Sequence, residues 1–495
     1  MMCRKIVRNG VVLAGISWVM ACIPNALAQQ SQQMQQQQSV LQRLEALEQE
    51  NQVLKANQRK LIAEQSASET AASSNNKKRA SSTQTGLQTN AEFGYGLLDP
   101  TTDIRFKQLA ILQARQDGTL PANSVNLQGA VTAIANYQES NEADRFGYLM
   151  RHPTGANQVG TSVSEAVVHS AQLGFSASLG GWVSANMELL FDPEQSFGSG
   201  INTDIERNQV HVRKAFVLLG NLAESPFYLS LGKMVIPFGL TDTVNPFTAS
   251  TVWHAFGGIA NGATLGYVKN GLNLSFMAIE GGSQFRAANT PVNGTNVPSK
   301  LNNHAVDVNY TVPLADGHSL LAGASYQRGS AYCQEFPIQH FEPCNDNNPA
   351  YDIYARYQAG KLTLKAEWAE TTEKWPGTFN PVSFPQFAAS DVTSFDVGLK
   401  YRSGLLGMPA DVSVEFSRFD AGPDDAPWEK QDQYVLGLAA FATSSVKLFA
   451  EYIRTDGFAP LNFLSGGLGG TPAGPPLSSA TAHSDVYLVG INAAF

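Results

Sequence analysis

The sequence has little charge and no long apolar segment beyond its N-terminal region. Charged residues make up 15% of the 495 residues, whereas soluble domains usually contain about 25%. No apolar run of about 18 residues follows the N-terminal region, and this excludes a transmembrane helix there. Low charge without a helical span is typical of a transmembrane β-barrel, whose strands show only weak alternation.

The sequence also lacks the short motifs of common catalytic and phosphate-binding sites. It contains no G-x-S-x-G, no H-E-x-x-H and no P-loop. His169 and His211 fall in predicted strands, without a Ser or carboxylate partner at a fixed spacing. We therefore expect neither an enzyme nor a cofactor.

Cysteine is scarce. Cys3 and Cys22 lie in the N-terminal leader, which leaves Cys333 and Cys344 in one polar stretch. Two thiols are too few for a zinc site, so we expect no metal. In an exported protein this pair predicts a disulfide within a loop.

Basic residues are outnumbered by acidic ones. The formal net charge is −9, and without the leader residues Arg4, Lys5 and Arg8 the chain has 30 basic and 42 acidic residues. Nucleic-acid binding needs a basic face. Nucleic acid is therefore not expected as a partner.

Residues 1–28 have the pattern of a secretory signal peptide. A basic stretch precedes the apolar run 11–23, and Ala26-Leu27-Ala28 offers a small-x-small cleavage site. The alternative is a lipobox-like stretch that ends at Cys22, which would then be lipid-anchored. Either signal exports the chain.

Residues 29–65 predict an α-helical coiled coil in the periplasm. Apolar residues recur every seven positions, with a second series three positions earlier. This seam predicts a homo-oligomer of open copy number; the alternative is an isolated surface helix. Its residues are Val40, Leu44, Leu47, Asn51, Leu54 and Leu61. Residues 66–124 are interpreted as a linker and pre-barrel segment.

Residues 125–495 show short runs with an alternating pattern. In residues 361–368, Leu362, Leu364 and Trp368 fall on one face, while Lys365 and Glu367 fall on the other. Alternation of period two predicts strands with one apolar face. Sixteen are predicted: 125–137, 166–179, 181–190, 209–219, 226–234, 262–269, 271–280, 303–312, 317–328, 350–358, 361–370, 391–402, 410–419, 432–441, 446–455 and 483–495.

The connections between these strands alternate between long and short almost without exception. Outer-membrane barrels have this asymmetry, with tight periplasmic turns and long external loops. We therefore predict an all-β fold, a 16-stranded antiparallel transmembrane β-barrel with the N-terminal coiled coil attached. Such a barrel contacts the lipid bilayer and lipopolysaccharide, and sixteen strands leave room for an aqueous pore.

The chain ends in Phe495, on an apolar stripe with Tyr487, Val489 and Ile491. An aromatic last residue on such a stripe resembles the signal by which barrels reach the barrel assembly machinery. We therefore expect this machinery to be a partner through Phe495. The predicted location is the cell outer membrane, multi-pass, with the N-terminus in the periplasm.

The long connection 235–261 is nearly free of charge and rich in aromatic and small residues. An external loop facing water should be more polar, so we predict that it folds into the barrel as a constriction; the alternative is an interface loop in an oligomer. Charges at a narrow point set selectivity. The candidate pore or substrate-binding residues are Lys233, Trp253, His254, Phe256, Arg213, Lys214, Arg286 and Arg328, although a cation on such a strand is more often just a lumen residue solvated by water. Acids of the opposite sign are expected on the lumen face at Glu367, Asp396, Asp411, Glu415 and Glu451.

The block Gly232-Lys233-x-x-x-Pro237-Phe238-Gly239, after the strand with Arg213-Lys214-Ala215-Phe216, resembles the phosphate-selective porin superfamily. The layout, including the stretch 146–151, resembles the siderophore porins of the legiobactin-receptor type. The resemblance implies a channel that takes up iron chelated by a carboxylate ligand. The arginine ladder of phosphate porins is missing, which argues against phosphate transport.

Energy-coupled siderophore receptors are 22-stranded barrels with a globular plug. Residues 91–124 are too few for such a plug, so we expect uptake of ferric siderophore without a plug domain or inner-membrane energy coupling. The alternatives are a general or anion-preferring diffusion porin for small solutes, and a structural envelope tether.

Overall fold

The structure is a computed structural model, and it shows a closed barrel of sixteen antiparallel strands. It describes residues 86–143, 160–192, 209–281, 300–314, 317–329, 349–373, 378–379, 385–387, 391–420, 422, 424–425, 429–457 and 480–495. All of them lie in one compact unit, Gln84–Phe495. The predicted signal peptide, the coiled-coil residues and both remaining cysteines, Cys333 and Cys344, lie outside the described residues.

Each barrel strand pairs with the strands before and after it, and the last strand pairs with the first. The barrel strands are β2 (Ser124–Ser140), β3 (Ser162–Leu179), β4 (Val183–Asp192), β5 (Gln209–Gly220), β6 (Phe227–Val235), β7 (Ile259–Lys269), β8 (Leu272–Ile279), β9 (Asn303–Pro313), β10 (His318–Gln327), β11 (Ala350–Ala359), β12 (Leu362–Thr371), β15 (Thr393–Leu405), β16 (Met408–Asp420), β17 (Lys430–Thr443), β18 (Val446–Asp456) and β19 (His483–Ala494). Ser484 to Ala494 of β19 run antiparallel to β2, which closes the ring.

These strands confirm the sixteen predicted from the alternating pattern, with shifted ends. The strand β7 begins at Ile259 and so takes three residues from the predicted loop 235–261. The short strand β1 (Gly86–Thr89) adds in parallel to the start of β2, where β19 has already ended. Two further short strands, β13 (Thr378–Phe379) and β14 (Pro385–Phe387), pair with each other.

The barrel is apolar outside and polar inside. On β12 the outward Trp368 is 48% exposed, whereas its inward neighbour Glu367 is 3% exposed. This is the reverse of a soluble protein, and it is the pattern of a barrel that faces lipid. Among the described residues, no helix is long and apolar enough to cross a membrane.

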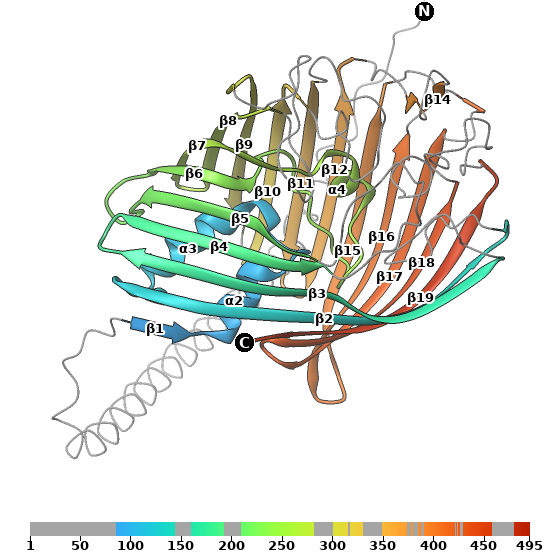
Figure 1. Cartoon of the computed structure of the whole chain (residues 1–495), viewed down its shortest axis with the longest axis horizontal. Helices are drawn as coiled ribbons and strands as arrows, with labels where there is room; N and C mark the ends of the chain where they lie inside the picture. The colour runs from blue at the N-terminus through green and yellow to red at the C-terminus, as the bar shows by residue number, and fades with distance from the viewer. Residues whose placement is uncertain are drawn as a thin grey trace, which may run out of the picture. The chain divides into compact units, whose positions relative to one another are not determined.

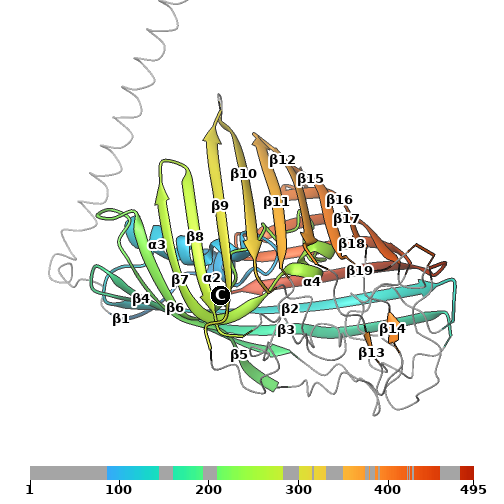
Figure 2. The same cartoon turned by 90° about the horizontal axis from the view of Figure 1, so that it is seen from above.

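The interior holds two parts of the chain that are not strands. The first contains α2 (Ala91–Leu98), η1 (Ile104–Phe106) and α3 (Lys107–Gln116), and the second contains α4 (Thr251–Phe256). Figures 1 and 2 show α2, α3 and α4 within the ring of strands from two directions. We call residues 90–123 the inner segment and residues 236–258 the inner loop.

The outward face generates a stability prediction. Val414 lies in the middle of β16 and is 50% exposed. Val414→Arg should destabilise the folded barrel in a bilayer by about 2–4 kcal/mol, because a charge then faces the lipid. Denaturant unfolding in lipid vesicles measures this, with Val414→Leu as the control. Equal stability of both variants would contradict the assignment of this face to lipid.

Candidate functional site

The inner loop is bound to the barrel wall by three inward-facing carboxylates. Glu367 on β12 accepts the backbone N–H of Leu240 at 2.7 Å and of Thr241 at 2.9 Å. A loop inside a barrel has no strand partner for its backbone N–H groups, so these groups need other acceptors. A carboxylate is a strong acceptor for them.

The two other carboxylates follow on β16 and β18. Glu415 accepts the N–H of Val244 at 3.0 Å and the side-chain amide of Asn245 at 2.9 Å. Glu451 accepts the N–H of Phe247 at 2.8 Å and that of Thr248 at 3.1 Å. We call Glu367, Glu415 and Glu451 the carboxylate clamp. The clamp consists of three of the five acids predicted on the lumen face.

Glycines make room for the clamped loop. A Cβ atom at Gly398 would lie 2.5 Å from a methyl carbon of Val244, and one at Gly437 would lie 2.5 Å from the Pro246 ring. In the Pro-Phe-Gly block, Gly239 has a positive φ of 62°, and a Cβ there would lie 2.2 Å from Glu367. The glycine of this block is therefore needed for a tight turn whose backbone lies against the Glu367 carboxylate.

Lys365 balances part of the negative charge. Its ammonium lies 3.1 Å from Glu367 and 2.8 Å from Asp396, and it also donates to the carbonyl of Asp242 in the inner loop. Two inward carboxylates and one loop carbonyl thus meet at the ammonium of Lys365. These acids are used to hold the loop, and this limits their contact with solute.

The inner segment is anchored by a buried arginine. Arg105 lies 2.6 Å from Asp307 on β9 and donates to the Tyr354 hydroxyl on β11 at 2.8 Å. Asp307 also accepts hydrogen bonds from Ser325 and Asn309. The side chains of Arg105 and Asp307 are 3% and 0% exposed, so the loss of either would leave a buried charge unpaired.

The inner segment and the inner loop also bind each other. The N–H of Thr243 donates to the Thr101 carbonyl at 3.0 Å. Arg356 on β11 bridges the two parts, at 2.8 Å from Asp103 and 3.0 Å from Asp242. The two parts therefore form one connected body inside the barrel.

This body fills one side of the lumen. Leu97, Ile111, Leu112 and Leu120 of the inner segment share one apolar core with Phe238, Val252 and Phe256 of the inner loop and with Phe216, Leu218 and Tyr228 of the wall. The residues of this core are nearly all inaccessible to solvent. Permeation through this side would require the core to open.

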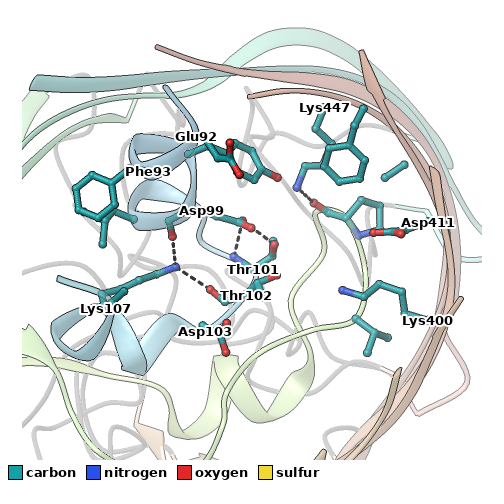
Figure 3. A pocket seen from close by; sticks show the side chains of 18 of the residues that line it. Glu92, Phe93, Asp99, Thr101, Thr102, Asp103, Lys107, Lys400, Asp411 and Lys447 are labelled. Atoms are coloured by element: carbon teal, nitrogen blue, oxygen red, sulfur yellow. Dashed lines mark hydrogen bonds between the residues drawn. The ribbon is translucent and has the colours of Figure 1, made fainter. Parts of the chain in front are cut away.

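The other side holds a cavity of about 720 Å³. It lies between α2, α3 and residues 244–246 of the inner loop on one side and β15–β18 on the other. Figure 3 shows Lys400, Asp411 and Lys447 facing it from the wall, opposite Glu92, Asp99 and Lys107 of the inner segment. The cavity is therefore lined by charges of both signs.

Two of these charges compensate each other within the inner segment. Burial raises the pKa of Asp99, but Lys447, Lys107 and hydrogen bonds from Thr101 outweigh it and lower the pKa overall. Burial lowers the pKa of Lys107, whose ammonium donates to the carbonyls of Gly96 and Thr102. Asp99 is therefore an anion held by two lysines.

The predicted aromatic residues of the loop lie on the packed side. Trp253 contacts Val235, Ile259 and Ile104 in a second small core, and the ring of Phe256 lies 6.0 Å from that of Phe238. Burial lowers the pKa of His254 to about 4, so it is neutral at pH 7. None of the three lines the cavity.

The structure separates the predicted cations. Arg213 and Lys214 lie together because a bulge in β5 turns both towards Glu188, at 3.0 and 2.6 Å. Lys233 is half-buried and donates to the Val212 carbonyl at 2.9 Å. Arg328 is exposed just beyond β10, and Arg286 lies outside the described residues.

Sequence reasoning missed the inner segment and most of the cavity lining. In the described part of the chain, no group of three or more His, Cys, Asp or Glu side chains could hold a metal ion.

The clamp generates a prediction for the inner loop. Glu415→Gln should speed hydrogen exchange at the Val244 amide by about tenfold, because a charge-assisted hydrogen bond is weakened. Mass spectrometry of the deuterated protein measures this, with Glu370→Gln as the control, since Glu370 accepts a hydrogen bond from the exposed Tyr351 hydroxyl. Unchanged exchange in Glu415→Gln would mean that the clamp does not hold the loop.

A second prediction concerns Asp242. Burial raises its pKa to about 6, with Asp103 and Glu367 adding to the rise and Arg356 and Lys365 opposing it. The Asp242 carboxyl therefore takes up a proton near pH 6 in the folded protein but only near pH 4 in the unfolded chain. Because the folded state binds this proton first, the free energy of unfolding rises as the pH falls from about 6 to 4. The stability gained by Asp242→Asn relative to wild type should therefore fall by about 2 kcal/mol from pH 7 to pH 4. Unfolding at both pH values measures it, and a constant difference would contradict the shift.

The chain is similar to several known proteins. A curated protein of Coxiella burnetii, named UPF0422 protein, is 24% identical over 319 residues, which cover 62% of this chain and 63% of that protein. The match thus spans less than two thirds of that relative.

Two solved structures are similar at low identity. An anion-selective porin from Comamonas acidovorans is 15% identical, with coverage of 75% of this chain and 99% of that chain and a TM-score of 0.46. The outer-membrane channel DcaP of Acinetobacter baumannii is 16% identical, with coverage of 75% and 97% and a TM-score of 0.43.

The sequence profile of one family, described as Gram-negative porin, matches residues 109–458. That range is more than half of the chain, and it runs from α3 to the end of β18. The chain therefore belongs to the Gram-negative porin family and is a multi-pass outer-membrane channel of porin type.

Proposed function

We propose that this porin is a selective channel that admits a ferric siderophore without inner-membrane energy coupling. The observation that carries the proposal is the divided lumen. The inner segment and the inner loop pack one side, and the cavity of about 720 Å³ is on the other. A space of this size matches a drug-sized molecule rather than an open diffusion pore.

The size of the inner segment supports passive movement. It comprises residues 90–123 and is built from two short helices and a single turn, whereas energy-coupled receptors have a globular plug in a 22-stranded barrel. A ferric complex of a carboxylate ligand has polar oxygens and a compact body. Both features fit a cavity with charged and aromatic walls.

The orientation follows from the turns. The short turns at Gly180, Asn270 and Gly360 lie at the same barrel end as Phe495, and in outer-membrane barrels the short turns face the periplasm. The cavity therefore lies in the periplasmic half of the channel. We also propose that the N-terminal coiled coil is periplasmic and joins copies of the chain, and that Arg213 and Lys214 contribute to solute contact.

We also propose that the barrel assembly machinery recognises the C-terminal Phe495. Phe495 exchanges two backbone hydrogen bonds with Gly129, at 2.9 and 3.0 Å, and is 55% exposed. An exposed aromatic ring at the last residue remains available to a binding partner.

The siderophore hypothesis predicts that loss of this protein impairs iron uptake. Under iron starvation, a deletion strain should lose uptake of radioactive iron from its purified siderophore, and the wild-type gene should restore it. Uptake should persist when the energy-coupling complex is deleted. Unchanged uptake in the deletion strain would leave a diffusion porin, and loss of uptake without the energy-coupling complex would refute passive movement.

A further inference from the structure

The inner loop crosses the wall strands at the border of the cavity that faces away from the short turns. Successive loop residues lie against successive strands, from β15 to β17. These pairs are Val244 with Gly398, Asn245 with Glu415 and Pro246 with Gly437. On each of these strands the cavity lining lies nearer the short turn. The clamped loop therefore covers the extracellular side of the cavity along β15–β17.

Beyond β17 the cover continues as the side chain of Phe247. Glu451 on β18 holds its backbone N–H at 2.8 Å. The Phe247 ring stacks on Phe449 of β18 at a centroid distance of 5.1 Å, and it meets His169 of β3 edge-on at 4.8 Å. The strands β19 and β2 lie between these two contacts. This ring therefore covers the sector of the wall from β18 to β3.

The inward face of the wall in this sector is apolar. Val435, Ile453 and Val486 are cross-strand neighbours on β17, β18 and β19. Leu488 on β19 and Ile134 on β2 belong to the same core, and all five side chains are at most 4% exposed. We call these five residues the apolar belt, and the Phe247 ring packs against the core that contains it.

Phe247 is less tightly enclosed than its neighbours in the loop. It is partly exposed, whereas Asn245 and Thr248 are 3% and 2% exposed. The backbone N–H groups of Phe247 and Thr248 are both held by Glu451. A change of side-chain rotamer moves the ring without breaking these hydrogen bonds. The ring can therefore turn aside while the loop stays clamped.

An apolar constriction resists hydrated solutes by more than its width. Water between apolar walls lacks hydrogen-bond partners, so such a constriction closes a channel by dewetting. Polar groups that enter it lose their hydration without a replacement. In this channel the apolar belt lines the path even when the Phe247 ring has moved.

We infer that Phe247 and the apolar belt form a hydrophobic gate between the cavity and the extracellular half of the lumen. The gate admits solutes that carry apolar surface more readily than small hydrated ions. The inference goes beyond the proposed function, because it concerns every solute that uses this side of the channel.

Single-channel conductance of the full-length protein in planar bilayers tests the gate. Asn and Leu side chains have the same number and branching of heavy atoms, so they separate polarity from bulk. Phe247→Asn should raise the conductance for potassium chloride by about fivefold, because its amide offers hydrogen bonds to water in the gate. Phe247→Leu keeps the gate apolar, so its conductance should stay within about twofold of wild type.

A variant of the wall tests the gate without touching the loop. Val486→Thr keeps the branched shape of the side chain and adds a hydroxyl to the apolar belt. It should raise the conductance by about twofold. Phe256→Leu is the control, since Phe256 is fully buried in the core on the packed side of the lumen. Its conductance should equal that of wild type.

Higher conductance in both polar variants, with no such rise in Phe247→Leu, supports the gate. Wild-type conductance in Phe247→Asn would overturn it. An equal rise in Phe247→Leu and Phe247→Asn would also overturn it, because bulk rather than apolar character would then close the path. If Phe247→Asn gives no folded barrel, Val486→Thr decides, and an unchanged conductance would refute the gate.

The uptake experiment on the siderophore is independent of these recordings. A channel that shows the gate but takes up no ferric siderophore would refute the proposed function and retain the gate. A channel that takes up the siderophore but conducts equally in all variants would do the reverse.

Discussion

Carboxylates that point inward from the barrel wall and accept backbone N–H groups hold the interior of this porin together. A chain segment inside a barrel cannot join the strand ladder, so its N–H groups must find acceptors elsewhere. Glu367, Glu415 and Glu451 supply them to the inner loop. Once the loop is fixed, it offers Thr243 and Asp242 as attachment points for the inner segment. These carboxylates accept hydrogen bonds from the loop, so their negative charge stabilises the interior of the channel rather than attracting cations from solution.

The clamp also explains why the lumen is asymmetric. The loop lies along the inner faces of β12 and β15–β18, and its apolar residues share one core with the inner segment, with β5–β7 and with Phe419 of β16. That packing closes one side. The remaining space is the cavity between the inner helices and β15–β18. The charged side chains of these strands, among them Lys400, line it. The inner segment thus forms one wall of the cavity, opposite the barrel strands.

The sequence predicted the barrel well because strand alternation is a local signal. Lys365 and Glu367 faced inward as expected from their opposition to Leu364 and Trp368, and all sixteen strands followed from such runs. Entry of the loop into the lumen followed from its low charge. The inner helices could not be predicted in the same way, because Ile111 and Leu112 have apolar partners only after the barrel has closed around them. For the same reason Trp253 and Phe256 were expected at an open constriction, whereas they pack. Lys400 resembles any inward strand lysine until its neighbours are known.

The central claim is that ions and solutes pass on the β15–β18 side of the lumen alone. Thiol accessibility tests it directly, with single cysteines introduced in a background where Cys333 and Cys344 are replaced by serine. Lys400→Cys places a thiol in the cavity, and Ser230→Cys places one on the packed side, where Ser230 is fully buried. In planar bilayers, a charged thiol reagent should reduce the current through Lys400→Cys channels and leave Ser230→Cys channels unchanged. Equal reduction in both, or reduction in Ser230→Cys alone, would contradict the account.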